Sequence, residues 1–169
     1  MTDLASQLES LARAFDERFA APQQSPSQAV VDLLEVRCAS ERLALETGRL
    51  LLVEPARRVI AVPGAPASCS GVAGVRGKLV AVYPLLSSCR PGQTPSGVLL
   101  LTRLDPSLAF FVDAVERYSR VESDRISVLP AGPDEPSRAI AKLASGPVPL
   151  VSVDDLVRKI LSAAGGEHA

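Results

Sequence analysis

The sequence GVAGVRGKLVAVYPL at Gly71–Leu85 decides the fold class, because glycines at three-residue intervals precede an apolar run. Two interpretations compete: a loop that cradles a phosphate, or a turn that leads into a β-strand. A Walker loop has a glycine five positions before its Gly-Lys pair and a serine or threonine after it, but Val72 and Leu79 stand at those positions. A dinucleotide-binding fingerprint fails because Ala73 stands where a glycine belongs. The stretch therefore predicts a glycine-shaped turn followed by a strand over Gly77–Leu85.

Short runs of branched and aromatic residues recur along most of the chain, separated by turns that contain Gly, Pro and Ser. They predict further strands over Val30–Cys38, Leu43–Glu46, Arg49–Pro55, Arg57–Pro66, Gly97–Leu104, Leu108–Tyr118 and Arg125–Leu129. Short strands at this spacing favour β-barrels or a β-sandwich over alternating βαβ units.

The N-terminal segment, residues 1–20, has the pattern of an amphipathic helix. Its apolar stripe consists of Leu4, Leu8, Leu11, Phe15 and Phe19. A linker with two prolines follows at Ala21–Gln28. A stripe of this kind must be buried against something, and two interpretations stay open: the arm folds back on its own domain, or it docks on a partner or a second subunit.

A second helix is predicted near the C-terminus, within the closing segment Val148–Ile160 and beyond it. Ser152 is its predicted cap, and Asp155 three positions later forms a box-like pair with it. Its apolar face consists of Val153, Leu156, Val157, Ile160 and Leu161. Gly165-Gly166 ends the helix, so we expect one domain over residues 29–163 and a flexible tail over residues 164–169.

Composition excludes several classes of protein. The chain has 169 residues, 47% hydrophobic and 22% charged, with a net charge of -1, which is typical of a globular protein. That charge, with 4% aromatic residues, gives no reason to expect nucleic-acid binding. Apolar runs are too short for a membrane span, and we expect no signal peptide. Three separated cysteines then predict free thiols in a reducing cytoplasm.

No catalytic or metal-binding pattern emerges from the sequence, so we expect no enzyme activity, cofactor or metal. The single histidine, His168, is next to last in the chain, and no CxxC pair occurs. Asp154 and Asp155 fit the first turn of a helix, where carboxylates favour the helix dipole. Asp113, in an apolar strand, is expected at an edge or bonded to backbone amides. Cys89 lies in the polar loop Ser87–Gly97 and is expected to be an incidental, exposed thiol.

A binding surface is what remains, and Arg76 is its first candidate. Gly74 and Gly77 flank the Val75-Arg76 pair, so a partner backbone could approach closely there. The alternative is an arginine whose stem covers the core and whose head is solvated.

The series VIAVPGAPASCSGVAGVRGKLVAVYPL (Val59–Leu85) resembles the characteristic region of the CheW-like domain family, in which an Asn-x-Arg-Gly turn leads into an apolar strand. The match rests on Gly71-Val72, Arg76-Gly77, Val82 and Leu85. FFVDAV (Phe110–Val115), RISVLP (Arg125–Pro130), VPLVSVDDLVRKI (Val148–Ile160) and the opening stretch Val30–Pro55 resemble further parts of that family. The resemblance covers Ala29 to Leu161.

The resemblance implies a mainly β fold of two SH3-like, five-stranded barrels on a shared hydrophobic core. It implies a non-enzymatic, cytoplasmic adaptor that couples a chemoreceptor tip, which is a helical hairpin, to the regulatory domain of a histidine kinase. The alternative is a specialised CheW-like interaction or self-assembly module, which no longer couples receptor and kinase and binds a motility regulator or itself. Self-association through the N-terminal helix is a separate interpretation that stays open. The family's turn arginine maps onto Arg76, which supports receptor coupling there.

The sequence departs from the family pattern at several positions. Gly74 replaces the usual Asn, and Ala81 and Pro84 replace a Pro and an Asp. Leu50-Leu51-Leu52 is apolar where typical couplers carry a Val-x-Glu pattern, so the loss of that glutamate predicts a more apolar partner. The predicted partner-binding residues are therefore Arg76, Gly77, Gly74, Leu50 and Leu52. The arm is predicted to cover this apolar strand in cis or in trans.

Overall fold

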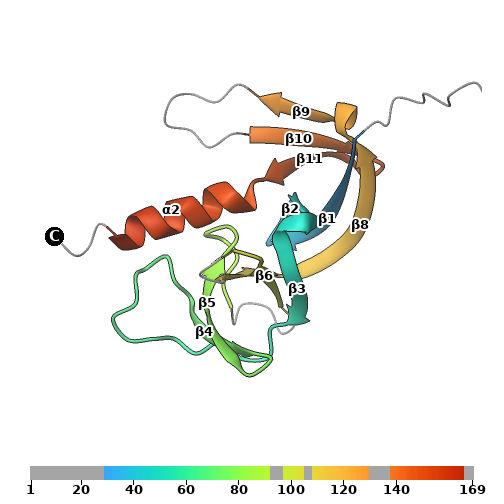
Figure 1. The fold of residues 1–169 in the computed structure, drawn as a ribbon. Helices are drawn as coiled ribbons and strands as arrows, with labels where there is room; N and C mark the ends of the chain where they lie inside the picture. Colours follow the sequence, from blue (N-terminus) through green and yellow to red (C-terminus); the bar gives the residue numbers. More distant parts are fainter. Residues whose placement is uncertain (1–28, 92–96, 105–107, 130–137, 166–169) are drawn as a thin grey trace, which may run out of the picture.

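The computed structural model of the chain describes residues 29–91, 97–104, 108–129 and 138–165. The predicted arm with its five contact residues, the linker, and residues 166–169 of the predicted tail lie outside these described residues. The described part is mainly β, with two sheets, in which most strand pairs are antiparallel, and one C-terminal helix (Figure 1).

The first sheet has six strands in the order β8-β1-β2-β11-β10-β9. Their bounds are β8 (Ala114–Glu122), β1 (Val30–Cys38), β2 (Glu41–Glu46), β11 (Gly146–Val151), β10 (Arg138–Leu143) and β9 (Ile126–Leu129). Only the β11–β2 pair is parallel. The short 3-10 turns η1 (Thr47–Arg49) and η2 (Ser123–Arg125) follow β2 and β8.

The second sheet has five strands in the order β3-β6-β7-β5-β4. Their bounds are β3 (Leu50–Pro55), β6 (Val98–Thr102), β7 (Leu108–Val112), β5 (Lys78–Pro84) and β4 (Gly71–Val75). The sheet curls, as an ion pair described below shows: it joins the hairpin at one edge of the sheet to the strand at the other edge. The family resemblance implied two five-stranded barrels. The first sheet has six strands, and the sequence analysis did not predict one of them, β10.

The apolar residues of β1 and β2 are buried on both faces of the first sheet. Leu34 and Leu45 belong to a large core cluster that also contains residues of β4 to β7 and of the C-terminal helix. Leu33 and Ala44, which point the opposite way, belong to a smaller cluster with side chains of β8, β10 and β11. Because both faces are buried, apolar residues stand next to one another in these strands, at Leu33-Leu34 and at Leu43-Ala44-Leu45. A core shared between the two sheets was predicted and is present.

The C-terminal helix α2 (Val153–Gly165) packs one face into the large cluster. Ser152 caps it as predicted, since its Oγ accepts a hydrogen bond from the Asp155 backbone N–H at 3.2 Å. Val153 and Val157 are buried, and Leu156 and Ile160 are half-buried against the same cluster. The helix continues to Gly165, so the predicted tail at 164–169 was placed two residues too early.

Two strand predictions were wrong. Residues 57–66 form no strand beyond a single bridge between Ile60 and Val72, because Pro63 and Pro66 cannot donate backbone hydrogen bonds and Ile60 is exposed. The predicted strand Leu108–Tyr118 is broken at Asp113 into β7 and β8.

Gly71–Val75, expected to shape a turn, is itself the strand β4. Only Arg76 and Gly77 form the turn. Gly71 is required there for packing: its φ is +136°, and a Cβ would lie 2.2 Å from the Ile60 carbonyl oxygen.

Candidate interaction surfaces

The β4–β5 hairpin presents Arg76 at its tip. Val75 pairs with Lys78, which leaves Arg76 and Gly77 as a two-residue turn with φ of +47° and +78°. Positive φ at both central residues is what a type I′ hairpin turn requires. Gly77 adopts this conformation freely, while Arg76 is held in it. The turn thus fixes the point from which the Arg76 side chain leaves the backbone.

An ion pair joins Arg76 to β3 at the opposite edge of the second sheet. Arg76 Nε donates to Glu54 Oε1 at 3.0 Å, and the Arg76 side chain stays 71% exposed. Because β3 and β4 are the two edge strands in the sheet order, this contact requires the sheet to curl upon itself. The pair therefore places a largely exposed guanidinium over the seam between the two edges.

A shallow apolar hollow of about 260 Å³ lies beside this seam. Its lining comes from β3, β6 and the hairpin: Leu51, Leu52, Val75, Arg76, Lys78, Val80 and Leu101. Leu51 is 54% exposed, and Leu79, on the adjoining hairpin strand, is 78% exposed. We call Arg76, Glu54, Leu51, Leu52 and Lys78 the seam surface.

The predicted site residues fall at different depths. Arg76, Gly77 and Gly74 share the hairpin, and the space above the exposed Gly74 is open. Leu52 is half-buried and lines the hollow. Leu50, however, lies in the core at 6% exposure and does not enter the surface, because the strand alternates and its odd-numbered neighbours Leu51 and Val53 face outward.

Sequence reasoning missed Glu54 and treated the strand's glutamate as lost. The strand does carry a glutamate, two positions beyond Leu52, and it pairs with the turn arginine. The alternation of exposed and covered positions along Leu50–Pro55 is the signal that could have separated Leu51 and Val53 from Leu50. The pairing across 22 residues has no local signal in the sequence.

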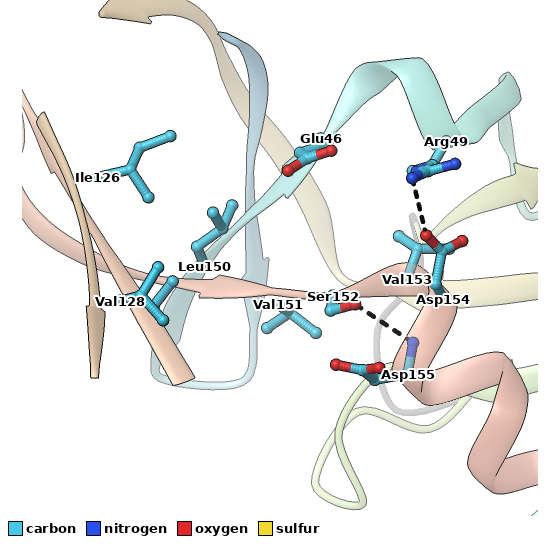
Figure 2. A pocket seen from close by; sticks show the side chains of 11 residues that line it. Glu46, Arg49, Ile126, Val128, Leu150, Val151, Ser152, Val153, Asp154 and Asp155 are labelled. Carbon is cyan, nitrogen blue, oxygen red and sulfur yellow. Dashed lines mark hydrogen bonds and ion pairs between the residues drawn. The ribbon is translucent and has the colours of Figure 1, made fainter. Parts of the chain in front are cut away.

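A second hollow lies between α2 and the strands β9, β10 and β11 (Figure 2). Ile126, Val128 and Leu150 line one side of it, and an ion pair of 3.0 Å between Arg49 and Asp154 lies on the other. A larger apolar hollow of about 590 Å³ adjoins it. The two share Ala139, Leu150, Val151, Ser152 and Asp155, but Ile126 and Val128 of the first hollow and Leu129 and Ile140 of the larger one lie on opposite faces of the sheet. We call the larger hollow the α2 groove.

The aspartates that the sequence analysis considered as candidate catalytic groups form structural hydrogen bonds and ion pairs. Asp113 Oδ2 accepts a hydrogen bond from the Ala39 backbone N–H, as the sequence predicted. Asp155, in addition to its place at the helix start, pairs with Arg158 at 3.0 Å. In the part of the chain that the structure describes, no group of three or more His, Cys, Asp and Glu side chains could hold a metal ion.

Cys89 was predicted to be exposed and is instead buried, at 1% exposure. It packs in the large core cluster with Cys38, and both thiols are free. A hydrogen bond between the two thiols raises the pKa of Cys89 and lowers the pKa of Cys38. The polar character of the surrounding loop misled the prediction, because the side chain points inward from it.

Glu35 is a buried carboxylate that the sequence analysis did not single out. It is 2% exposed on β1 and accepts hydrogen bonds from the hydroxyls of Ser119 at 2.5 Å and Ser145 at 2.8 Å. These partners lie on β8 and in the β10–β11 turn, so the carboxylate links β1 to β8 and to that turn. Its hydrogen bonds offset the cost of burying a charge.

None of the helices in the described residues is long and apolar enough to span a membrane.

Comparisons with known proteins identify the family. The family model of the CheW-like domain matches residues 32–161. Among solved structures, the scaffolding protein TtCheW from Thermoanaerobacter tengcongensis is similar, with a TM-score of 0.62 and 16% identity over 78% of this chain and 90% of that one. No curated protein matches the sequence. The chain belongs to the CheW-like domain family.

Proposed function

We propose that this chain is a non-enzymatic scaffold of a bacterial chemosensory or motility pathway, which couples a chemoreceptor tip to the regulatory domain of a histidine kinase in the cytoplasm. Membership of the CheW-like family supports the scaffold role in general. We also propose that the two sheets form the two SH3-like barrels that the family resemblance implies; the curl of the second sheet supports this for one of them.

The Arg76–Glu54 ion pair is the observation that carries the proposal. It holds an exposed guanidinium beside the apolar hollow that the exposed Leu51 lines. Arginine is enriched among the energetic hot spots of protein interfaces, which lie in well-packed, desolvated pockets. A receptor hairpin that packs apolar residues on the hollow and an acceptor group on Arg76 would use both features. We therefore assign the receptor contact to the seam surface.

The test measures binding of a receptor cytoplasmic fragment that contains the hairpin tip, by calorimetry. We expect Arg76→Glu to weaken binding about tenfold or more, which corresponds to about 1.4 kcal/mol. The matched control is Arg120→Glu, because Arg120 also forms an exposed ion pair, 2.9 Å from Asp32, but on the first sheet.

The double variant Arg76→Glu with Glu54→Arg separates the two roles of the arginine. If the pair acts only by holding the two edges together, the swapped pair restores binding; if the receptor needs the positive charge at position 76, it does not. Unchanged binding in Arg76→Glu would overturn the assignment. Binding to neither the receptor fragment nor the kinase domain would favour the alternative, a CheW-like interaction or self-assembly module.

A further inference from the structure

We propose that the N-terminal segment of this same chain, residues 2–20, docks in cis in the α2 groove. The inference goes beyond the proposed function. It places the arm in the α2 groove, and not on the apolar strand β3 that the sequence analysis expected the arm to cover.

The floor of the α2 groove is formed by half-buried apolar side chains, among them Ile140, Val151 and Leu156. Val151 and Leu156 pack against the large core cluster. The floor of the groove therefore continues that cluster. At its rim Leu129 is 41% exposed.

The described chain begins one strand length away from this groove. The Ser123 backbone N–H donates to the Ala29 carbonyl at 2.8 Å, and Val30 pairs with Glu122. β1 thus starts at the η2 corner from which β9 departs (Figure 1). β9 leads from this corner to the groove, which Leu129 lines at the far end of the strand.

The linker, residues 21–28, is long enough to reach the groove from the start of β1. β9 has four residues and spans about 13 Å. The eight residues 21–28 can extend to about 27 Å, so residue 20 can lie anywhere along β9. A segment of 19 residues forms a helix about 28 Å long, compared with about 20 Å for the 13 residues of α2. An arm helix is therefore long enough to span the part of α2 that lines the groove, from Ser152 to Lys159.

The chemistry of the segment fits an apolar groove. Its stripe from Leu4 to Phe19 recurs at the spacing with which amphipathic helices enter such grooves. An isolated helix of this length is only marginally stable in water, so packing must supply its stability. A short linker also raises the effective concentration of the arm above that of any second copy, which favours docking in cis.

Photo-crosslinking of the full-length chain tests the proposal without receptor or kinase, so its outcome is independent of the proposed function. The photoreactive residue p-benzoylphenylalanine replaces Phe15, and the cross-linked peptides are mapped by mass spectrometry. A mixture of isotope-labelled and unlabelled chains distinguishes links within one chain from links between two. We expect links within one chain to residues of β9, β10 or α2.

Two matched variants check the groove. Leu129→Glu introduces a charge at a 41%-exposed groove position, and we expect loss of the cross-link. Leu79→Glu introduces the same charge on β5, outside the groove and at 78% exposure, and we expect the cross-link to remain. Circular dichroism confirms that both variants fold. Links to residues 49–55 or 78–84, links only between chains, or no dominant link would each overturn the proposal.

Discussion

At the scale of single residues, the turn that carries Arg76 depends on the backbone of Gly77. Gly77 has a φ of +78° and open space around the position where a Cβ would stand. A substitution there consequently costs backbone strain and no steric clash. Gly74, in the adjoining strand, has open space as well and no positive φ, so it serves as a matched position.

We expect Gly77→Ala to lower the free energy of unfolding by about 1–2 kcal/mol, the cost of left-handed backbone for a residue with a Cβ. Gly74→Ala is expected to change it by about 0.5 kcal/mol at most. The measurement is the urea midpoint of each variant. Equal midpoints for the two variants would show that the hairpin does not hold the turn conformation described here.

A second prediction concerns the pKa of Asp32. Arg120 Nε lies 2.9 Å from Asp32 Oδ1, and this hydrogen bond, with a further one from Tyr118, holds the pKa of the Asp32 carboxyl below its ordinary value. Because the pKa is lowered in the folded state, the contact stabilises the fold above the ordinary carboxyl pKa. This contribution is lost as the pH falls through the lowered value.

Arg120→Gln is therefore expected to raise the pKa of Asp32, and a carboxyl chemical-shift titration by NMR measures it. A pKa that is identical in the variant and in the unmodified chain would mean that the ion pair does not persist in solution.

At the scale of elements, the start of α2 shapes the groove that we assign to the arm. Ser152 both caps the helix and lines the groove. We expect Ser152→Ala to destabilise the protein by about 1 kcal/mol and Ser152→Asp to retain most of the stability, because an aspartate can accept the same backbone hydrogen bond. Chemical denaturation measures both. Equal losses in the two variants would contradict the capping role.

The strands were predictable where local pattern decides them. β1 and β6 follow their apolar runs, and Ser152 identified the start of α2. The prediction failed at residues 57–66, where apolar residues alternate with prolines and glycine and remain exposed. It also failed at β4, because Gly71 and Gly74 were taken to form the turn, although both pair with residues of β5.

The candidate site was only partly predictable for a related reason. Arg76 stands out in the sequence because glycines flank it. Its partner Glu54 does not, because only the curl of the second sheet brings β3 to the β4–β5 hairpin. Glu35 likewise meets serines 84 and 110 residues away. Contacts between distant segments follow from topology, which the local pattern does not contain.

At the scale of the whole molecule, the large core cluster joins the two sheets and α2 into one body. The seam surface and the α2 groove lie on different elements of this body, the first on β3 with the β4–β5 hairpin, the second on α2 with β9 to β11. The receptor contact that we propose and the arm that we place in the α2 groove therefore use different surfaces and do not compete.

The most direct test of the scaffold role is sedimentation of three purified components: the full-length chain, a receptor fragment with the hairpin tip, and the kinase regulatory domain. We predict that receptor fragment and kinase domain sediment together only when the chain is present, and that Arg76→Glu releases the receptor fragment while the kinase domain stays bound. Co-sedimentation that is unaffected by the chain, or no complex that contains both partners, would contradict the account.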